Sequence, residues 1–312
     1  MDTELYFKDG EMVNKIYTSG TKYVFLESES SILTDFAESN RHLVEINQLF
    51  DSYLFNLSNL HSFYELFFGD NIRKKATAQF AYEVEDRISI NVLTNNLVSA
   101  AVTLINAMEV FVKWLSENNY LSQFDEIKLN WTSNAYDTSF EYRFFFLLRN
   151  FMQHNHLSVS VLAEADGKIR CCFDLAQILN TPHFNMKSEI KKELKNLAKK
   201  MEQGLYKHSG LAYTITIAKF HVKTLDLYCQ YFEIIDTAIE NICTLCNSCI
   251  DSNKNALKGS ADELEGFVVY ESENVLHAFE PNPDFYCNKF AQMKKRAHEI
   301  YSQDAKALEG IK

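Results

Sequence analysis

The stretch INVLTNNLVSAAVTLINAMEVFVKWL, residues 90–115, decides the class of fold. Its apolar residues recur every three or four positions, which places them on one face of an α-helix. The members of this face are Ile90, Leu93, Leu97, Ala101, Leu104, Met108, Phe111 and Leu115. Since no proline or glycine interrupts the stretch, we predict one long helix over residues 86–118 that packs its apolar face against other helices.

The same periodicity predicts further helices along the chain. One runs from Leu33 to Phe67, and Gly69 and Asp70 end it. Another begins at a capping box formed by Thr138 and Glu141, and it ends near residue 154 or 156. Three more helices are expected over residues 186–202, 213–251 and 284–305. The chain has only three prolines, all after residue 181, so long uninterrupted helices are expected.

Short β-segments accompany these helices. Residues 1–30 alternate between short strands and turns, and Asp166-Gly167 separates two alternating runs in a hairpin over about 158–175. A second hairpin is expected over 266–279. The prediction is therefore a mainly α fold: a bundle of long antiparallel helices over 31–252 with small β-hairpin additions. The short strands of 1–30 precede this bundle, and a hairpin plus helix over 253–312 follows it.

Composition narrows the cellular setting and the class of partner. The chain has no apolar signal segment at its start and no run of about 18 apolar residues, so neither secretion nor membrane insertion is expected. Its seven cysteines are scattered, which is typical of reduced thiols in a cytoplasmic protein. The net charge of −11 opposes nonspecific nucleic-acid binding, so any RNA contact requires a local basic patch.

A polar cluster ends the aromatic run FEYRFFFLLRNFMQHNHLSV, residues 140–159. On a helix, Asn150 lies beside His154, and Arg149 shares a face with His156 if the helix continues that far. Arginine offers a permanent charge and a fork of donors to phosphate oxygens, and histidine transfers protons near neutral pH. The competing interpretation is structural, because Arg, Asn and His also suit the negative end of a helix dipole.

This run resembles the signature helix of the HEPN superfamily, whose members share a helical bundle and an Arg-Asn-x-x-x-His motif. The resemblance implies a HEPN-like bundle and a metal-independent endoribonuclease that needs no cofactor. Arg149 would stabilise the scissile phosphate, His154 would act as general acid or base, and Asn150 would position them. His156 also fits the looser motif spacing, so it remains an alternative catalytic histidine.

The resemblance also implies partners. HEPN sites are usually composite, which means that two copies of the motif meet across a dimer. Because this chain has one copy, we expect a homodimer that acts on RNA. The family further suggests a toxin or phage-defence effector with an antitoxin or an activating partner. One alternative is a catalytically inactive HEPN-type bundle that binds a protein or a nucleotide. Another is an unrelated helical interaction protein.

Two further groups of residues are candidates for the same site. Three polar residues interrupt the apolar face of the predicted 86–118 helix: Asn95, Asn96 and Ser99. They are expected either to line the site or to hydrogen-bond between helices. The lysines of the 186–202 helix offer a basic face for RNA, and the alternative is an ordinary solvated surface. This face includes Lys187, Lys191, Lys195 and Lys199.

The sequence favours no metal site. CTLCNSC, residues 243–249, has the spacing of some metal motifs, but it lies in a helical pattern where cysteines three apart do not converge on one ion. No Gly-rich phosphate loop, G-x-S-x-G elbow or H-E-x-x-H motif is present, which argues against nucleotide-dependent, serine-hydrolase and zinc-protease chemistry.

Overall fold

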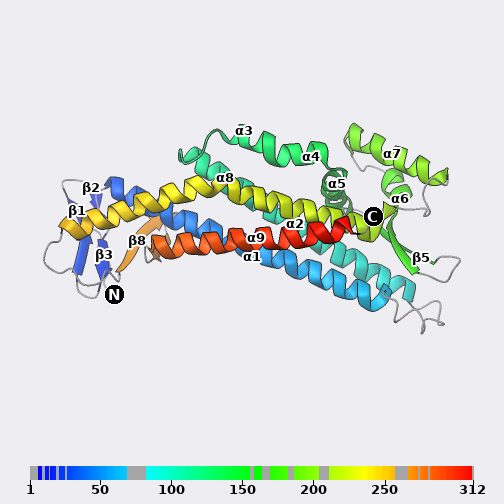
Figure 1. Cartoon of the computed structure of the whole chain (residues 1–312), viewed down its shortest axis with the longest axis horizontal. Helices are drawn as coiled ribbons and strands as arrows, with labels where there is room; N and C mark the ends of the chain where they lie inside the picture. The colour runs from blue at the N-terminus through cyan, green and yellow to red at the C-terminus, as the bar shows by residue number, and fades with distance from the viewer. Residues whose placement is uncertain are drawn as a thin grey trace. The chain divides into compact units, whose positions relative to one another are not determined.

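The computed structural model describes residues 6–8, 11–13, 15–18, 21–24, 27–68, 82–154, 158–163, 169–181, 186–203, 211–256, 266–272, 275–279 and 282–310. Side chains are described for most of the helical residues and for part of the strands. Over these ranges the fold is mainly α, as the sequence predicts (Figure 1).

Long helices dominate the chain. They are α1 (Glu27–Phe68), α2 (Tyr82–Glu117), α8 (Tyr213–Ala256) and α9 (Pro283–Glu309). α5 (Phe140–His154) carries the polar motif, and α7 (Ser188–Glu202) carries the lysines. The predicted helices all form, although α1 begins at Glu27 instead of Leu33 and α8 continues past residue 251.

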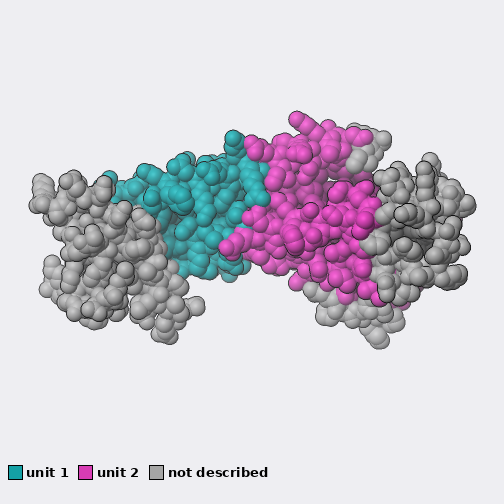
Figure 2. Space-filling model, turned by 90° about the horizontal axis from the view of Figure 1, so that it is seen from below, with its two compact units in different colours: residues 1–47, 109–124, 231–297 teal, residues 48–108, 125–230, 298–312 magenta. Residues whose placement is uncertain are grey.

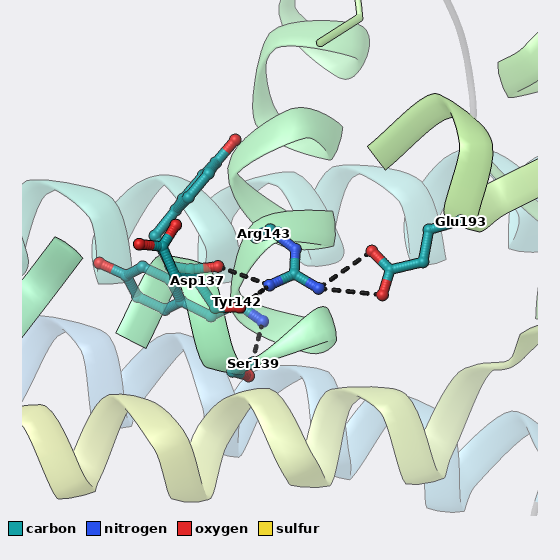
Figure 3. A network of polar contacts seen from close by, with 6 residues as sticks. Asp137, Ser139, Tyr142, Arg143 and Glu193 are labelled. Atoms are coloured by element: carbon teal, nitrogen blue, oxygen red, sulfur yellow. Dashed lines mark hydrogen bonds and ion pairs between the residues drawn. The ribbon is translucent and has the colours of Figure 1, made fainter. Parts of the chain in front are cut away.

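The predicted cap of α5 is wrong by one residue. Short helices α3 (Phe124–Lys128) and α4 (Asn134–Thr138) precede α5, with a π-helical turn (Leu129–Ser133) between them. Thr138 therefore belongs to α4, and its hydroxyl donates to the carbonyl of Asn134 at 2.7 Å. The backbone becomes extended only at Ser139, whose Oγ accepts from the Tyr142 N–H at 3.2 Å (Figure 3).

The strands form small antiparallel sheets. β5 (Val159–Ala163), β6 (Ile169–Phe173) and β7 (Leu211–Ala212) lie in the order β5-β6-β7, which includes the hairpin predicted over 158–175. The predicted Asp166-Gly167 turn lies outside the described residues. The short helix α6 (Leu175–Asn180) follows β6 and is capped by the carboxylate of Asp174.

Strands from the two ends of the chain share a second sheet. Its order is β4-β3-β8-β9, from β3 (Lys15–Thr18), β4 (Thr21–Val24), β8 (Gly266–Ser272) and β9 (Val275–Phe279). A separate pair joins β1 (Tyr6–Lys8) to β2 (Glu11–Val13). The sequence predicts the hairpin of β8 and β9 but not its pairing with the N-terminal strands, because such pairing joins segments far apart in the chain.

The chain divides into two compact units (Figure 2). Unit 1 comprises residues 1–47, 109–124 and 231–297, and unit 2 comprises 48–108, 125–230 and 298–312. α1, α2, α8 and α9 each contribute residues to both units, so the units interleave along the sequence. The domain boundaries at residues 30 and 252 follow sequence signals and stay a prediction.

Aromatic side chains fill the core of unit 2, which contains α5. The Phe145 ring stacks on Phe220 of α8 with centroids 4.3 Å apart. The Phe173 ring of β6 meets both Phe144 and Phe145 edge-on, at 5.1 and 5.5 Å. These contacts hold α5 against both α8 and the sheet, so the position of the polar motif is set by a packed core.

The apolar face predicted for α2 is confirmed. All of its members are buried except Leu93, which is half-buried. By length and composition alone, Arg87–Glu117 of α2 could cross a membrane, although half of its most apolar window is buried within the structure. The core helices of soluble proteins show the same combination, and no other helix among the described residues meets the criterion.

Candidate functional site

The polar motif occupies the last turns of α5. Arg149 is half-buried, Asn150 is exposed, and the helix continues to His154. Asn150 and His154 are four residues apart in one helix and so lie on the same side of it. The side chain of His154 and the whole of His156 lie outside the described residues, so the choice between these histidines stays open.

Arg149 carries an unsatisfied donor. The neighbouring Leu148 and Phe151 are fully buried, and Arg149 itself is half-buried. Its Nε is buried, and among the described residues it has no hydrogen-bond partner. A buried donor left unpaired costs about 1–3 kcal/mol, and an oxyanion is the ligand that best removes this cost for a guanidinium.

Arg143, six residues earlier in α5, has hydrogen-bond partners for both of its terminal nitrogens. Its Nη1 donates to the carbonyls of Tyr136 and Asp137 at 2.7 and 2.6 Å. Its Nη2 donates to both carboxylate oxygens of Glu193 in α7 at 2.9 and 3.0 Å (Figure 3). Arg143 therefore holds α4, α5 and α7 together, whereas the Arg149 Nε has no hydrogen-bond partner among the described residues.

α2 fixes the chain immediately after the motif. The Asn91 Oδ1 accepts from the Val159 N–H at 2.8 Å, and the Asn91 Nδ2 donates to the Val159 carbonyl at 2.9 Å. The same Nδ2 donates to the carbonyl of Arg87 at 2.7 Å. The Asn91 amide thus pairs with both backbone polar groups of Val159, as a residue of a neighbouring strand would, and holds the start of β5 against α2.

Three more buried polar atoms have no hydrogen-bond partner among the described residues, and they belong to residues near Asn91 and Val159 in the sequence. They are the Arg87 Nε, the Asn95 Oδ1 and the Ser158 Oγ. The sequence pattern points to Asn95 but not to Arg87, Asn91 or Ser158. The signal that could have found the first two is the four-residue spacing of Arg87, Asn91 and Asn95, which places three polar groups along one side of α2.

Asn96 and Ser99 lie toward the surface of α2, and their role in lining the site stays a prediction. Asn96 is exposed, beside the half-exposed Val92, so it does not interrupt the packed face. Ser99 is half-buried, and its backbone carbonyl accepts from the Thr103 hydroxyl at 2.8 Å. In the described ranges, no hydrogen bond or ion pair joins Asn95, Asn96 or Ser99 to Arg149 or Asn150.

α7 presents its lysines to solvent. Ile190 and Leu194 are buried, whereas the lysines at 191, 195 and 199 are exposed. The Nζ of Lys187, just before the helix, lies 4.7 Å from the centroid of the Tyr136 ring. The basic face is therefore open to a polyanion, and its role in RNA binding stays a prediction.

The CTLCNSC run contributes core residues. Cys243, Cys246 and Cys249 are buried in α8, and all seven cysteines of the chain are thiols, outside any disulfide. Burial raises the pKa of Cys246 to about 12 and also raises the pKa of Cys243, which disfavours the thiolate that binds metals. Within the described residues, no group of three or more His, Cys, Asp or Glu side chains is arranged to hold a metal ion.

No family model, curated protein or solved structure matches this chain. The functional assignment therefore rests on the motif at the end of α5 and on the polar groups around it.

Proposed function

We propose that this chain is a HEPN-like, metal-independent endoribonuclease acting as a toxin or phage-defence effector. The observation that carries the proposal is the buried Nε of Arg149 at the end of α5, which has no partner among the described residues and lies one residue before an exposed Asn150. Arg143, by comparison, uses its terminal nitrogens to bond the last carbonyls of α4 and the Glu193 carboxylate.

In the proposed reaction the 2′-hydroxyl of a ribose attacks the adjacent phosphorus. The attacking oxygen loses its proton to a histidine, and the departing 5′-oxygen gains one, so the products are a 2′,3′-cyclic phosphate and a 5′-hydroxyl. Arg149 binds the phosphoryl oxygens, where negative charge accumulates in the transition state. His154 is the proposed general acid or base, and the Asn150 amide orients it or the substrate.

The remaining expectations belong to the same proposal. A second copy of the chain would bring a second motif to a composite site, so the active form is a homodimer. RNA is the substrate, the lysines of α7 bind its backbone, and the protein acts in the cytoplasm. An antitoxin or an activating partner controls it.

The direct test is RNA cleavage by the purified full chain with and without EDTA, followed by analysis of the product ends. We expect EDTA-resistant cleavage that leaves 2′,3′-cyclic phosphates and is lost in Arg149→Ala and His154→Ala. His156→Ala, tested in parallel, decides between the two histidines. Matched controls are Arg41→Ala and His61→Ala, whose residues are exposed on α1.

Three outcomes contradict the proposal: cleavage that depends on a metal, cleavage that survives both substitutions in the motif, and no cleavage of tRNA, mRNA or rRNA. The last would favour the catalytically inactive bundle. In that case Arg149 would bind the phosphate of a nucleotide without chemistry.

A further inference from the structure

Two cysteines of unit 1 meet between α8 and α9. The Cys243 Sγ, in α8, lies 3.9 Å from the carbonyl oxygen of Pro283, in the first turn of α9. Pro283 stands one helical turn before Cys287, so the Cys243 sulfur lies against the stretch of backbone that carries Cys287. A side-chain hydrogen bond joins the two thiols. The two sulfur atoms are therefore neighbours, although they belong to different helices.

An ion pair between the same two helices gives this register independently. Lys294 of α9 donates to Asp236 of α8 at 2.9 Å. The start of α9 meets Cys243, whereas the later Lys294 meets the earlier Asp236, so the two helices are antiparallel here. Residues seven apart lie on one face of a helix. Seven residues back from Lys294 is Cys287. Seven residues on from Asp236 is Cys243, so the register places the two cysteines opposite each other.

The two thiols differ in their access to solvent. Cys287 is half-buried, whereas the other six cysteines of the chain are all buried. Burial, together with the hydrogen bond to Cys287, raises the pKa of Cys243, so the Cys243 thiol stays protonated. An oxidant in solution therefore meets Cys287 first, and the Cys243 sulfur is already in place to react with the product.

We propose that Cys243 and Cys287 form a reversible redox pair, in which a peroxide converts the two thiols into a disulfide that joins α8 to α9. In the first step the Cys287 thiolate attacks one oxygen of hydrogen peroxide. An S–O bond forms and the O–O bond breaks. The departing hydroxide takes up the proton that the Cys287 thiol released, so the products are a sulfenic acid and water.

In the second step the Cys243 sulfur attacks the sulfur of this sulfenic acid. An S–S bond forms, the S–O bond breaks, and the departing hydroxide leaves with the Cys243 proton as a second water. The two thiols together lose two electrons, and these reduce the peroxide to water. A dithiol reductant returns both cysteines to thiols by disulfide exchange.

The disulfide closes the segment of chain that carries β8 and β9, the hairpin that pairs with β3. A crosslink of this kind stabilises a fold mainly by restricting the unfolded chain. In a reducing compartment such bonds are usually transient and respond to oxidation. The pair therefore makes the stability of unit 1 depend on oxidant, and this role is independent of the proposed ribonuclease activity.

The test uses the purified full chain, first reduced, then freed of reductant and treated with a small excess of hydrogen peroxide. Remaining thiols are blocked with N-ethylmaleimide in denaturant, and tryptic peptides are analysed by mass spectrometry without reduction. We expect peptide 224–254 to be linked to peptide 259–289, which contains Cys287, and the link to disappear on reduction. The yield should be the same at two protein concentrations, because the reaction is intramolecular.

Variants identify the partner, because peptide 224–254 contains four cysteines. Cys287→Ser and Cys243→Ser should each abolish the link. In Cys243→Ser the sulfenic acid of Cys287 should persist and be trapped by dimedone. The matched control is Cys246→Ser, which removes a buried thiol one turn away in α8 and should leave the link intact. Circular dichroism of each reduced variant verifies that its helices are formed.

Thermal unfolding measures the consequence of the bond. The oxidised chain should unfold about 5 °C above the reduced chain, and Cys287→Ser should show no such difference. The proposal is overturned by the absence of a link between the two peptides, by a link that survives in Cys243→Ser, or by Cys287 joined only to Cys287 of a second copy. A linked chain whose unfolding temperature does not rise also overturns it.

None of these measurements depends on RNA cleavage. A chain that forms the disulfide but cleaves no RNA keeps the redox pair and loses the proposed catalysis. A chain that cleaves RNA but forms no disulfide loses the redox pair alone.

Discussion

A single nitrogen of Arg143 donates to both carboxylate oxygens of Glu193, at 2.9 and 3.0 Å, across 50 residues of sequence. The other terminal nitrogen bonds the last carbonyls of α4. The arginine side chain is 15% exposed, whereas that of Glu193 is 40% exposed. This ion pair between Arg143 and Glu193 therefore joins α7 to the start of α5 through one largely buried guanidinium group.

Replacing Arg143 should destabilise the fold. Arg143→Ala removes four hydrogen bonds and leaves a half-buried carboxylate and carbonyl unpaired, so we expect the free energy of unfolding to fall by about 1–3 kcal/mol. Urea unfolding followed by circular dichroism measures this change. Arg41→Ala is the control: that arginine pairs with Glu38 and Glu45 on the surface of α1, and its loss should change stability by at most about 0.5 kcal/mol. Equal losses of unfolding free energy in Arg143→Ala and Arg41→Ala would contradict the role of Arg143 in holding α4, α5 and α7 together.

A chain of hydrogen bonds should anchor the end of α9. The Tyr53 hydroxyl lies 2.7 Å from the His221 Nδ1, and the His221 Nε2 lies 2.9 Å from the Asp304 Oδ2. Tyr53 and His221 are buried, so Asp304→Ala leaves a buried ring nitrogen unpaired and should cost about 1–2 kcal/mol. Hydrogen exchange of residues 298–309 should accelerate in this variant and not in the exposed neighbour Gln303→Ala. Unchanged protection in Asp304→Ala would show that apolar packing alone holds the helix.

Asp35 should make unit 1 less stable as the pH rises. Burial raises the pKa of this carboxyl above its usual value of 3.8, although the hydrogen bond from Tyr120 partly opposes the shift. A raised folded-state pKa means that the contribution of Asp35 to stability is fully present below pH 3.8 and is lost as the pH rises through the folded pKa.

Asp35→Asn tests this linkage, because the amide stays neutral and its oxygen can still accept from the Tyr120 hydroxyl, which lies 2.7 Å from the carboxylate in the wild type. The variant should gain stability relative to the wild type between about pH 4 and pH 7. Chemical unfolding midpoints of both chains across this range give the difference. A difference that does not vary with pH would refute the raised pKa.

The lysines of α7 should set the salt dependence of RNA binding, if the chain is the proposed ribonuclease. Each phosphate contact with single-stranded RNA contributes about 0.7 to the slope of log affinity against log salt. Changing Lys191, Lys195 and Lys199 to Gln should therefore reduce the slope by about 2, measured by fluorescence anisotropy with a labelled oligonucleotide. Lys306→Gln, at an exposed position of α9, serves as the control. A slope that the triple substitution leaves intact would exclude this face of α7.

Local sequence was sufficient to predict most helices and the buried face of α2. Residues such as Leu97, Leu104 and Phe111 repeat at the helical period, and burial of that face follows directly from the period. Local sequence was not sufficient for the start of α5. Thr138 and Ser139 are both good N-caps, and only the preceding turn of α4 assigns the role to Ser139.

Local sequence likewise decided some features of the candidate site, and the tertiary structure decided the others. The sequence by itself determined that Arg149, Asn150 and His154 lie in one helix, because their spacing and the helix are both local properties. Only the tertiary structure decided that Arg143 is bonded by Glu193 while Arg149 keeps a buried donor without a described partner. It also decided that the Asn91 side chain pairs with the backbone of Val159. The physical reason is that hydrogen-bond satisfaction depends on groups 50 to 68 residues away, and helical periodicity holds no information about them.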